Sequence, residues 1–509
     1  MMVATGIREW LDWMRINAPG AQLALDSRRV QRGDVFLACR GEGGDGRSYI
    51  AQAIDAGAAA VLFDDADNFQ WNDTWAVPNL PVAQLSQQIG HIAHEWYAQP
   101  DAGLFSIAVT GTNGKTSCTQ WLGQALSRSG LPTTVIGTLG AGLYRNGTSG
   151  AFVATGYTTP DAVQLHRQLA AQKSQGARAL AIEASSIGLA QGRMEQLHVD
   201  CAVLTNFTRD HLDFHGTMEA YEEAKAKLFD WPALKHTVLN LDDALGQKLI
   251  ARMRSTNPSV KMLGYTTEGA QVDGIAMLSA TEIRISHQGT SFQLHSPFGS
   301  GPVRTHLIGH FNVSNVLAIA GVLFVRGLTF DQVVDQLEAL MPVPGRLEQL
   351  GGTDAPLAVI DYAHTPDALA KALGTLRAVA DMRHGQLWCV FGCGGDRDPG
   401  KRPEMGAASD CADHIIVTSD NPRSEDPAAI IAAIVEGLPE ASRGKLQIID
   451  DRATAILSAI RHADKHDVIL VAGKGHEDYQ EIKGRRLAFR DADHASLALA
   501  TRATRYGGH

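Results

Sequence analysis

The sequence contains little cysteine. Six residues among 509 are scattered at Cys39, Cys118, Cys201, Cys389, Cys393 and Cys411. No two of them form a Cys-x-x-Cys pair, so neither a disulfide framework nor a zinc site is indicated. Cys389 and Cys393 flank the end of an apolar stretch, and we expect both to be thiols of a hydrophobic core rather than ligands.

The sequence also lacks a membrane-spanning stretch, because its longest apolar run, near residues 316–325, is too short to cross a bilayer. The N-terminal segment carries Glu9 and Asp12 and has no signal-peptide hydrophobic region. The formal net charge of −10 argues against nonspecific nucleic-acid binding. We therefore expect a cytoplasmic protein that binds small molecules, with neither nucleic acid nor membrane as a partner. A monomer is expected.

The segment around which the chain is organised runs from residue 104 to residue 130. An apolar run at 104–109 predicts a buried strand, and helical apolar spacing follows the glycine-rich turn. The turn ends in Gly-x-x-Gly-Lys-Thr, with Lys115 able to reach terminal phosphates and the Thr116 hydroxyl able to bind Mg²⁺. Val109 stands where the full Walker pattern has glycine. A phosphate-binding loop is predicted; the alternative is a tight turn with a solvated lysine.

At this length the chain is too long for one core, and we expect about two to four domains. Segments containing proline and glycine at 97–103 and 342–345 mark the boundaries. They divide the chain into units at 1–100, 101–338 and 339–509.

The first unit has a predicted strand at 35–38 and helical apolar spacing at 49–60. The second unit alternates strands with helices, which predicts a mostly parallel α/β sheet. One of its helices is expected to begin at 158–160, with proline near the first turn.

Polar side chains follow two predicted strands of the second unit, at 179–182 and 201–204. Glu183 ends the first strand, and a polar cluster that contains His211 follows the second. Ligands bind outside such strand ends in open α/β sheets, so a shared site is predicted there. His211 on its own would more often be structural.

The third unit has four predicted strands, each followed by a polar loop that contains glycine or proline. They lie at 358–364, 387–391, 414–418 and 468–472. This pattern predicts a second α/β sheet with its binding loops on one edge. Arg397 and Arg423 could hold a carboxylate or a phosphate, and Glu477 could pair with an amine.

Taken together, these residues resemble the Mur ligases of peptidoglycan synthesis, a family that includes folylpolyglutamate synthetase. The motifs are Gly-Thr-Asn-Gly-Lys-Thr at 111–116, Gly-His-Phe-Asn at 309–312, Gly-Arg at 345–346 and Gly-Lys-Gly-His-Glu at 473–477. Asp-Asn-Pro-Arg at 420–423 is similar to the recognition sequence of the diaminopimelate-adding members. The resemblance implies an α/β fold of three domains, with a central parallel sheet like that of P-loop ATPases and a Rossmann-like C-terminal domain.

The resemblance also implies which residues bind ATP and Mg²⁺. The ATP phosphates are assigned to Gly111, Thr112, Asn113, Gly114, Lys115, Thr116 and Ser117. Further nucleotide contacts are assigned to Asn312, Arg346 and His364. The metal-binding group is Thr116, Glu183, His211 and Lys225. The catalytic group is Lys115, Glu183, His211 and Lys225.

The substrates implied are UDP-N-acetylmuramoyl-L-alanyl-D-glutamate and meso-2,6-diaminopimelate. The UDP-muramoyl dipeptide is assigned to Leu25, Ser27, Glu42, Gly43, Gly44, Tyr157, Thr158, Thr159, Ser185, Gln191 and Arg193. The diaminopimelate is assigned to Arg397, Asp420, Asn421, Pro422, Arg423, Gly473 and Glu477.

Lys225 and Lys227 lie in a predicted helix at 221–229, and the simplest interpretation is that both are solvated surface residues. The resemblance instead implies that Lys225 is carbamylated, which would turn a cation that repels metal into an anionic oxygen donor.

The implied reaction activates a carboxylate as an acyl phosphate, which an amine then attacks. Lys115, the loop N–H groups and Mg²⁺ suit the first step because two anions must approach each other. A P-loop phosphotransferase and a noncatalytic nucleotide-binding regulator are the alternatives. The first leaves the arginines of the third unit unexplained, and the second leaves the catalytic set unexplained.

Overall fold

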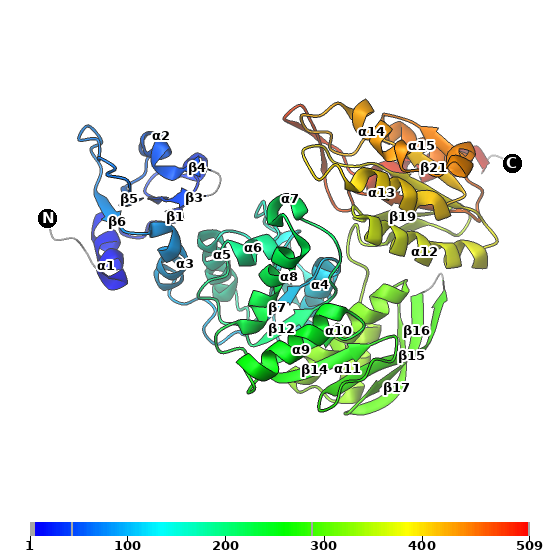
Figure 1. Cartoon of the computed structure of the whole chain (residues 1–509), viewed down its shortest axis with the longest axis horizontal. Coiled ribbons are helices and arrows are strands. Elements are labelled where there is room, and N and C mark those ends of the chain that lie inside the picture. Colours follow the sequence, from blue (N-terminus) through cyan, green and yellow to red (C-terminus); the bar gives the residue numbers. More distant parts are fainter. Residues whose placement is uncertain (1–5, 42–43, 287–288, 507–509) are drawn as a thin grey trace.

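A computed structural model describes the chain at residues 6–41, 44–286 and 289–506 (Figure 1). Three sheets follow one another along the molecule, from the N-terminal part in blue to the C-terminal part in yellow and red. Within the described residues, no helix is both long and apolar enough to cross a membrane.

The N-terminal sheet is four-stranded and parallel, in the order β1-β2-β5-β6. Its strands are β1 (Leu23–Ala24), β2 (Val35–Ala38), β5 (Ala60–Asp64) and β6 (Asn79–Val82), with a small hairpin of β3 (Arg40–Gly41) and β4 (Gly44–Asp45). The helices are α1 (Ile7–Asn17), α2 (Ile50–Asp55) and α3 (Leu85–Trp96).

The strand predicted at 35–38 is confirmed, whereas the helical prediction over 49–60 is only partly right. Helix α2 covers six residues and ends at Asp55. Gly57 then takes a left-handed conformation with φ of 100°, which turns the chain, and Ala60 already belongs to β5.

The central sheet has eleven strands in the order β10-β9-β8-β11-β7-β12-β13-β14-β15-β16-β17. Its parallel part consists of β7 (Phe105–Thr110), β8 (Thr133–Gly137), β11 (Ala179–Glu183), β12 (Cys201–Leu204), β13 (His236–Asn240), β14 (Lys261–Thr266) and β15 (Ala276–Ser286). The edges are antiparallel, with β9 (Gly140–Arg145), β10 (Thr148–Ser149), β16 (Gly289–Ser296) and β17 (Gly299–Thr305). The expected mostly parallel α/β sheet is confirmed, whereas its antiparallel edges were not predicted.

Helices cover both faces of this sheet. They are α4 (Lys115–Arg128), α5 (Ala162–Ser174), α6 (Ser186–Ala190), α7 (Leu212–His215), α8 (Met218–Ala226), α9 (Ala244–Thr256), α10 (His310–Arg326) and α11 (Phe330–Glu338). Helices α4 and α10 pack on one face, where Trp121 and Leu317 are buried, and α5 and α9 pack on the other. The prediction that a helix begins at 158–160 is wrong, because the Asp161 side chain caps α5 by accepting from Gln164 N.

The C-terminal sheet has six strands in the order β18-β19-β23-β20-β21-β22, and all but β18 are parallel. Its strands are β18 (Glu348–Gly351), β19 (Leu357–Asp361), β20 (Leu387–Phe391), β21 (His414–Val417), β22 (Leu446–Ile448) and β23 (Val468–Ala472), with a separate hairpin of β24 (Tyr479–Ile482) and β25 (Arg485–Ala488). The helices are α12 (Pro366–Met382), α13 (Lys401–Ala408), α14 (Pro427–Glu436), α15 (Arg452–His462) and α16 (Asp491–Tyr506).

The four strands predicted in the third unit are adjacent in this sheet, as β19, β23, β20 and β21, so their loops leave from one edge. Their side chains form the two layers of a core, in which Cys389 and Cys393 are buried as expected. The same parallel register that builds the core therefore brings the four polar loops together.

Candidate active site

The predicted phosphate loop connects β7 to α4. Gly111 and Gly114 have φ of 146° and 86°, and a Cβ on Gly111 would collide with the Thr205 hydroxyl, so glycine is required there. The Lys115 ammonium donates to the carbonyl oxygens of Gly111 at 2.7 Å and Thr112 at 2.8 Å. Burial lowers the pKa of Lys115 from its usual value. The loop therefore holds its cation close to the N-terminus of α4.

Glu183 is fully buried at the carboxyl end of β11, beside the phosphate loop. Its carboxylate accepts from the Thr116 hydroxyl at 3.0 Å, from the Thr138 hydroxyl at 3.0 Å and from Thr138 N at 2.9 Å. Because β7, β8 and β11 are neighbouring parallel strands, all three residues reach the same point. This produces a pocket of oxygen atoms beside the loop.

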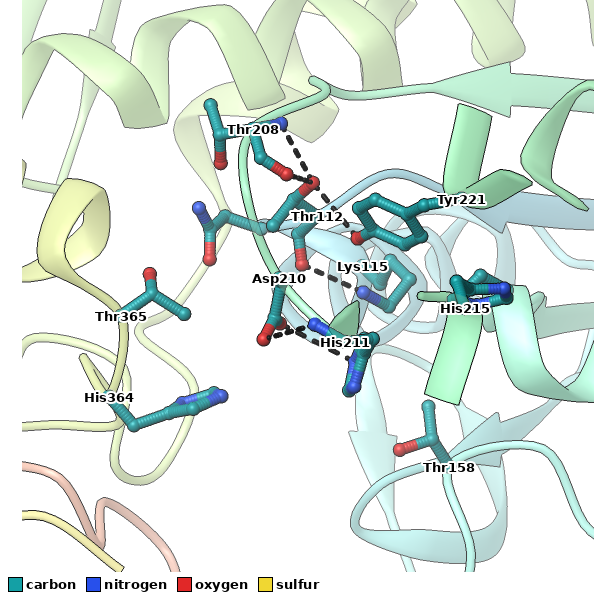
Figure 2. A network of polar contacts seen from close by, with 12 residues as sticks. Thr112, Lys115, Thr158, Thr208, Asp210, His211, His215, Tyr221, His364 and Thr365 are labelled. Carbon is teal, nitrogen blue, oxygen red and sulfur yellow. Dashed lines mark hydrogen bonds and ion pairs between the residues drawn. The ribbon is translucent and has the colours of Figure 1, made fainter. Parts of the chain in front are cut away.

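Asp210 and His211 follow β12 and face the loop (Figure 2). His211 takes a left-handed conformation with φ of 52° and caps α7, and its Nε2 lies 3.4 Å from Asp210 Oδ2. Burial lowers the pKa of His211, although Asp210 acts in the opposite direction. The imidazole is therefore largely neutral at neutral pH and can act as a ligand or as a hydrogen-bond partner.

Lys225 is fully buried in α8, so the plain surface interpretation is wrong for this residue, whereas Lys227 is exposed as expected. Lys225 Nζ donates to Gly111 O at 2.8 Å and lies 4.4 Å from the centre of the Tyr221 ring. Burial and then the neighbouring Lys115 lower the pKa of Lys225 well below its usual value. The side chain therefore has a larger neutral fraction than an exposed lysine.

A cavity of about 590 Å³ separates the loop edge of the central sheet from the C-terminal sheet. Among the hydrogen bonds that cross the boundary, Arg346 Nη2 donates to the Thr116 hydroxyl at 2.9 Å, and Asn113 Nδ2 donates to Asp367 at 3.2 Å. His364 faces Asp210 across the gap (Figure 2). Burial and the nearby Lys401 lower the pKa of His364 to about 4.

Most of the predicted nucleotide and metal residues line this one cavity. They are Thr112, Asn113, Gly114, Lys115, Thr116, Ser117, Glu183, His211, Asn312, Arg346 and His364. Thr158 and Ser185 of the predicted dipeptide path also line it. Gly111 and Lys225 are not among the described residues that line the cavity, and they are joined by their hydrogen bond.

Four of the predicted diaminopimelate residues lie at the loop edge of the C-terminal sheet. Glu477 accepts from Asn421 Nδ2 at 2.8 Å and from Lys474 Nζ at 2.9 Å, and Lys474 is itself fully buried. Burial raises the pKa of Glu477, and Lys474 opposes that rise. Gly473 packs against Asp420, since a Cβ there would collide with its carboxylate.

The two predicted arginines converge at Gly394. A Cβ on this glycine would lie 2.8 Å from Arg423 Nη1 and 3.9 Å from Arg397 Cγ. Arg423 donates to Gly395 O at 2.6 Å and takes a left-handed conformation with φ of 52°, immediately after the buried Pro422. Arg397 is exposed. The two arginine side chains therefore lie at the same edge of the sheet.

The predicted dipeptide residues are divided between two sheets. Tyr157 is 55% exposed and lies under the Arg193 guanidinium at 4.5 Å, and Arg193 also donates to Thr159 O and to Gln191. The Thr159 hydroxyl lies 2.8 Å from that of Ser185. The others lie beside the N-terminal sheet: Leu25 directly follows β1, the Ser27 hydroxyl donates to Gln52, and Gly44 belongs to the hairpin of β3 and β4. Glu42 and Gly43 lie outside the described residues.

Three residues of the site were not predicted from the sequence. Thr138 could have been found as the first residue after a strand, but only once β8 is known to lie beside β11. Asp210 lies next to His211 in the polar cluster, and Lys474 lies inside the motif at 473–477. Both therefore belong to segments that were singled out in the sequence, but no function was assigned to either residue.

Among the described residues, no group of three or more histidine, cysteine, aspartate or glutamate side chains is placed to hold a metal ion. The oxygen pocket has one carboxylate, on Glu183, together with the Thr116 and Thr138 hydroxyls. An ion with few protein ligands, completed by phosphate and water, fits this donor set better than a closed metal centre does.

A phosphate loop, a buried carboxylate beside it and an arginine, Arg346, that reaches the loop from the facing domain define an α/β enzyme of the P-loop class. Three segments match family profiles: residues 21–97 match "Mur ligase family, catalytic domain", residues 109–323 "Mur ligase middle domain" and residues 345–475 "Mur ligase, glutamate ligase domain". The chain belongs to the Mur ligase family.

Relatives resemble the chain over nearly its whole length. UDP-N-acetylmuramoyl-L-alanyl-D-glutamate--2,6-diaminopimelate ligase from Janthinobacterium sp. (strain Marseille) is 59% identical, over 99% of this chain and 98% of that protein. The protein of the same name from Ralstonia nicotianae is 50% identical, over 98% and 97%.

Solved structures show the same fold. A structure with that name is 37% identical and has a TM-score of 0.63, covering 94% of this chain and 95% of that one. A MurF ligase from Thermotoga maritima in complex with ADP has a TM-score of 0.65 at 18% identity, over 95% and 99%, and supports the fold alone.

Proposed function

We propose that the protein adds meso-2,6-diaminopimelate to UDP-N-acetylmuramoyl-L-alanyl-D-glutamate, with conversion of ATP to ADP and phosphate, in the synthesis of peptidoglycan precursors. The observation that carries this proposal is the loop edge of the C-terminal sheet, where Arg423, Arg397 and Glu477 can bind an amino acid with an extra carboxylate. Relatives that bear this ligase's name at 59% and 50% identity support it.

Three domains are proposed, at 1–100, 101–338 and 339–509. Support comes from the separate sheets and from the three matched segments, each of which falls inside one proposed domain. The cavity at the second boundary is lined from both sides, so closure of the domains would exclude water from a reactive intermediate.

In the first proposed step, an oxygen of the D-glutamyl carboxylate attacks the γ-phosphorus of ATP, and the bond to the bridging oxygen of ADP breaks. Lys115 is well placed to offset the repulsion between the two anions if its ammonium turns from the Gly111 and Thr112 carbonyls to the phosphates. Arg346, bonded to the Thr116 hydroxyl from the opposite domain, adds a second cation.

In the second step, a neutral amine of diaminopimelate attacks the acyl carbon, and phosphate leaves with the oxygen that came from the carboxylate. The amine must lose its proton before it attacks. The Glu477 carboxylate already accepts from the Lys474 ammonium, so it can receive and orient a second ammonium group, and its raised pKa favours uptake of the proton that the substrate must lose.

Thr116 and Glu183 are proposed to hold Mg²⁺, with His211 and a modified Lys225 serving a second ion. The ion would neutralise phosphate charge. The hard oxygen donors of Thr116 and Glu183 fit this role. His211 donates through a softer nitrogen, so it is better suited to the second ion, which it would share with other ligands.

Lys225 is proposed to be carbamylated. The neutral amine attacks the carbon of CO₂, an N–C bond forms, the electron pair of one C–O bond moves to oxygen, and nitrogen loses a proton. The lowered pKa of Lys225 supports this because only the neutral amine reacts. A buried lysine whose one hydrogen bond to a described residue is that to Gly111 O is otherwise costly to the fold.

The UDP-muramoyl dipeptide is proposed to run from the N-terminal sheet to the cavity. The proposed contacts in the described residues are Leu25, Ser27, Gly44, Tyr157, Thr158, Thr159, Ser185, Gln191 and Arg193. A monomer is proposed, with no nucleic acid or membrane as a partner. Substrates of this kind, ATP and a UDP-linked precursor, point to the cytoplasm.

The test is a ligation assay with purified protein, ATP, Mg²⁺, the UDP dipeptide and a panel of amino acids, with products identified by mass spectrometry. We expect the UDP tripeptide only with meso-diaminopimelate, together with equal amounts of ADP and phosphate. Release of ADP without an amide product would indicate a phosphotransferase, and preference for L-lysine would contradict the proposed specificity.

A further inference from the structure

A second cavity, of about 630 Å³, lies at the opposite edge of the central sheet from the phosphate loop. Its lining includes Arg128 and Arg326, the last residues of α4 and α10, and Arg178, which directly precedes β11. Both helices begin at the nucleotide cavity. Since α4 has 14 residues, the two cavities are about 21 Å apart along its axis.

The charged residues that line this cavity are all positive. No aspartate or glutamate is among the described residues that line it, and none of its three arginines forms an ion pair with a described carboxylate. The carboxyl ends of two helices contribute roughly half a negative charge each, which is less than the three full positive charges. An anion is therefore attracted to the cavity.

Two buried polar atoms on its lining residues have no protein partner among the described residues. Arg128 donates through Nη2 to the carbonyl of Ala339, but its Nη1 is buried without an acceptor. Gln336 Oε1 is likewise buried without a donor. Because both atoms are buried, a ligand can reach them only if the Arg128 and Gln336 side chains turn toward the cavity. A ligand that then satisfies both carries an anionic acceptor and a hydroxyl or amine donor.

We propose that this cavity binds an organic phosphate, with the phosphoryl group on the three arginines and a hydroxyl donating to Gln336. Inorganic phosphate would satisfy the arginines but leave most of the volume empty. The cavity has the size of a small-molecule site, and the side chains of Leu126, Leu131 and Leu328 add apolar wall for a carbon skeleton.

The test is isothermal titration calorimetry of the full-length protein with glucose 6-phosphate, inorganic phosphate and glucose as probes. We expect glucose 6-phosphate to bind more tightly than either of the other two. Arg326→Gln and Arg178→Gln should each weaken its binding at least about tenfold, because a charge-assisted hydrogen bond is lost. Both residues are exposed, so their replacement leaves the fold intact.

Two control variants locate the binding. Arg443→Gln, an exposed arginine of the C-terminal part, and Lys115→Met in the phosphate loop should both leave the affinity for glucose 6-phosphate unchanged. Loss of binding in Lys115→Met, or unchanged binding in Arg326→Gln, overturns the proposal. Equal affinity for inorganic phosphate would refute the claim that the ligand is an organic phosphate. Absence of any heat with about 10 mM glucose 6-phosphate would refute the claim that the cavity is a binding site.

Discussion

Replacing Arg423 with alanine is expected to raise the KM for diaminopimelate without changing the KM for ATP. The Arg423 side chain is 20% exposed, so solvent screens its charge only weakly. A hydrogen bond between an arginine and a carboxylate contributes about 1.5–3 kcal/mol, which corresponds to a rise in KM of about 10- to 140-fold. Arg423 is not among the described residues that line the nucleotide cavity, which is why ATP binding should be unaffected.

Arg486 provides the matched control. Its Nε lies 3.8 Å from Glu481 Oε2, and that of Arg423 lies 4.0 Å from the same atom, but the Arg486 side chain is 66% exposed. Arg486→Ala therefore removes a charge beside Glu481 without removing the proposed carboxylate contact. The assay is steady-state ligation with each substrate varied in turn. An equal rise in both KM values for Arg423→Ala, or the same effect from Arg486→Ala, would refute the reasoning.

Three further predictions concern catalysis and stability. Lys225→Gln should lower kcat about a hundredfold or more in the ligation assay, whereas Lys227→Gln, on the exposed side of the same segment, should leave it unchanged. Asp491→Asn should lower the free energy of unfolding in urea by about 3–5 kcal/mol, because Asp491 and Arg452 form a fully buried ion pair at 2.7 Å. Burial, and then the neighbouring His94, lower the pKa of His166 to about 4. Since the unfolded chain binds more protons between pH 6.5 and 4, stability should fall by about 3 kcal/mol as pH drops through that window, and His166→Phe should remove this part of the dependence.

Each of these predictions can fail clearly. Full activity of Lys225→Gln would remove the proposed carbamate. A loss below about 1 kcal/mol for Asp491→Asn would mean that the buried pair contributes no more than a surface pair does. Identical pH profiles for the wild-type protein and His166→Phe would show that His166 is not held neutral by the fold.

The strands of the parallel sheets could be predicted because they are buried on both faces and appear as short continuous apolar runs. Those at 35–38, 201–204, 387–391 and 468–472 match the observed bounds. Helix starts were less predictable. Asp161 caps α5, so the helix begins after the predicted 158–160, and a capping hydrogen bond depends on side-chain geometry that spacing does not reveal.

Some residues of the candidate site could be predicted from the sequence pattern, and others depend on tertiary packing. The phosphate loop and Glu183 could be located because each directly follows an apolar strand, and parallel strands end at one edge. Thr138 contributes only through the lateral order of the strands, which a linear pattern does not encode. The burial of Lys225 depends on the packing of α8 against the phosphate loop, a contact that spans 114 positions in the sequence.

The most direct measurement uses a UDP dipeptide whose D-glutamyl side-chain carboxylate carries ¹⁸O, with ATP, Mg²⁺ and meso-diaminopimelate. If the carboxylate attacks the γ-phosphorus and phosphate later leaves from the acyl carbon, one ¹⁸O atom moves into each phosphate released. Mass spectrometry of the phosphate should then show one label per amide bond formed. Tripeptide formation with unlabelled phosphate would contradict activation of the carboxylate by phosphoryl transfer.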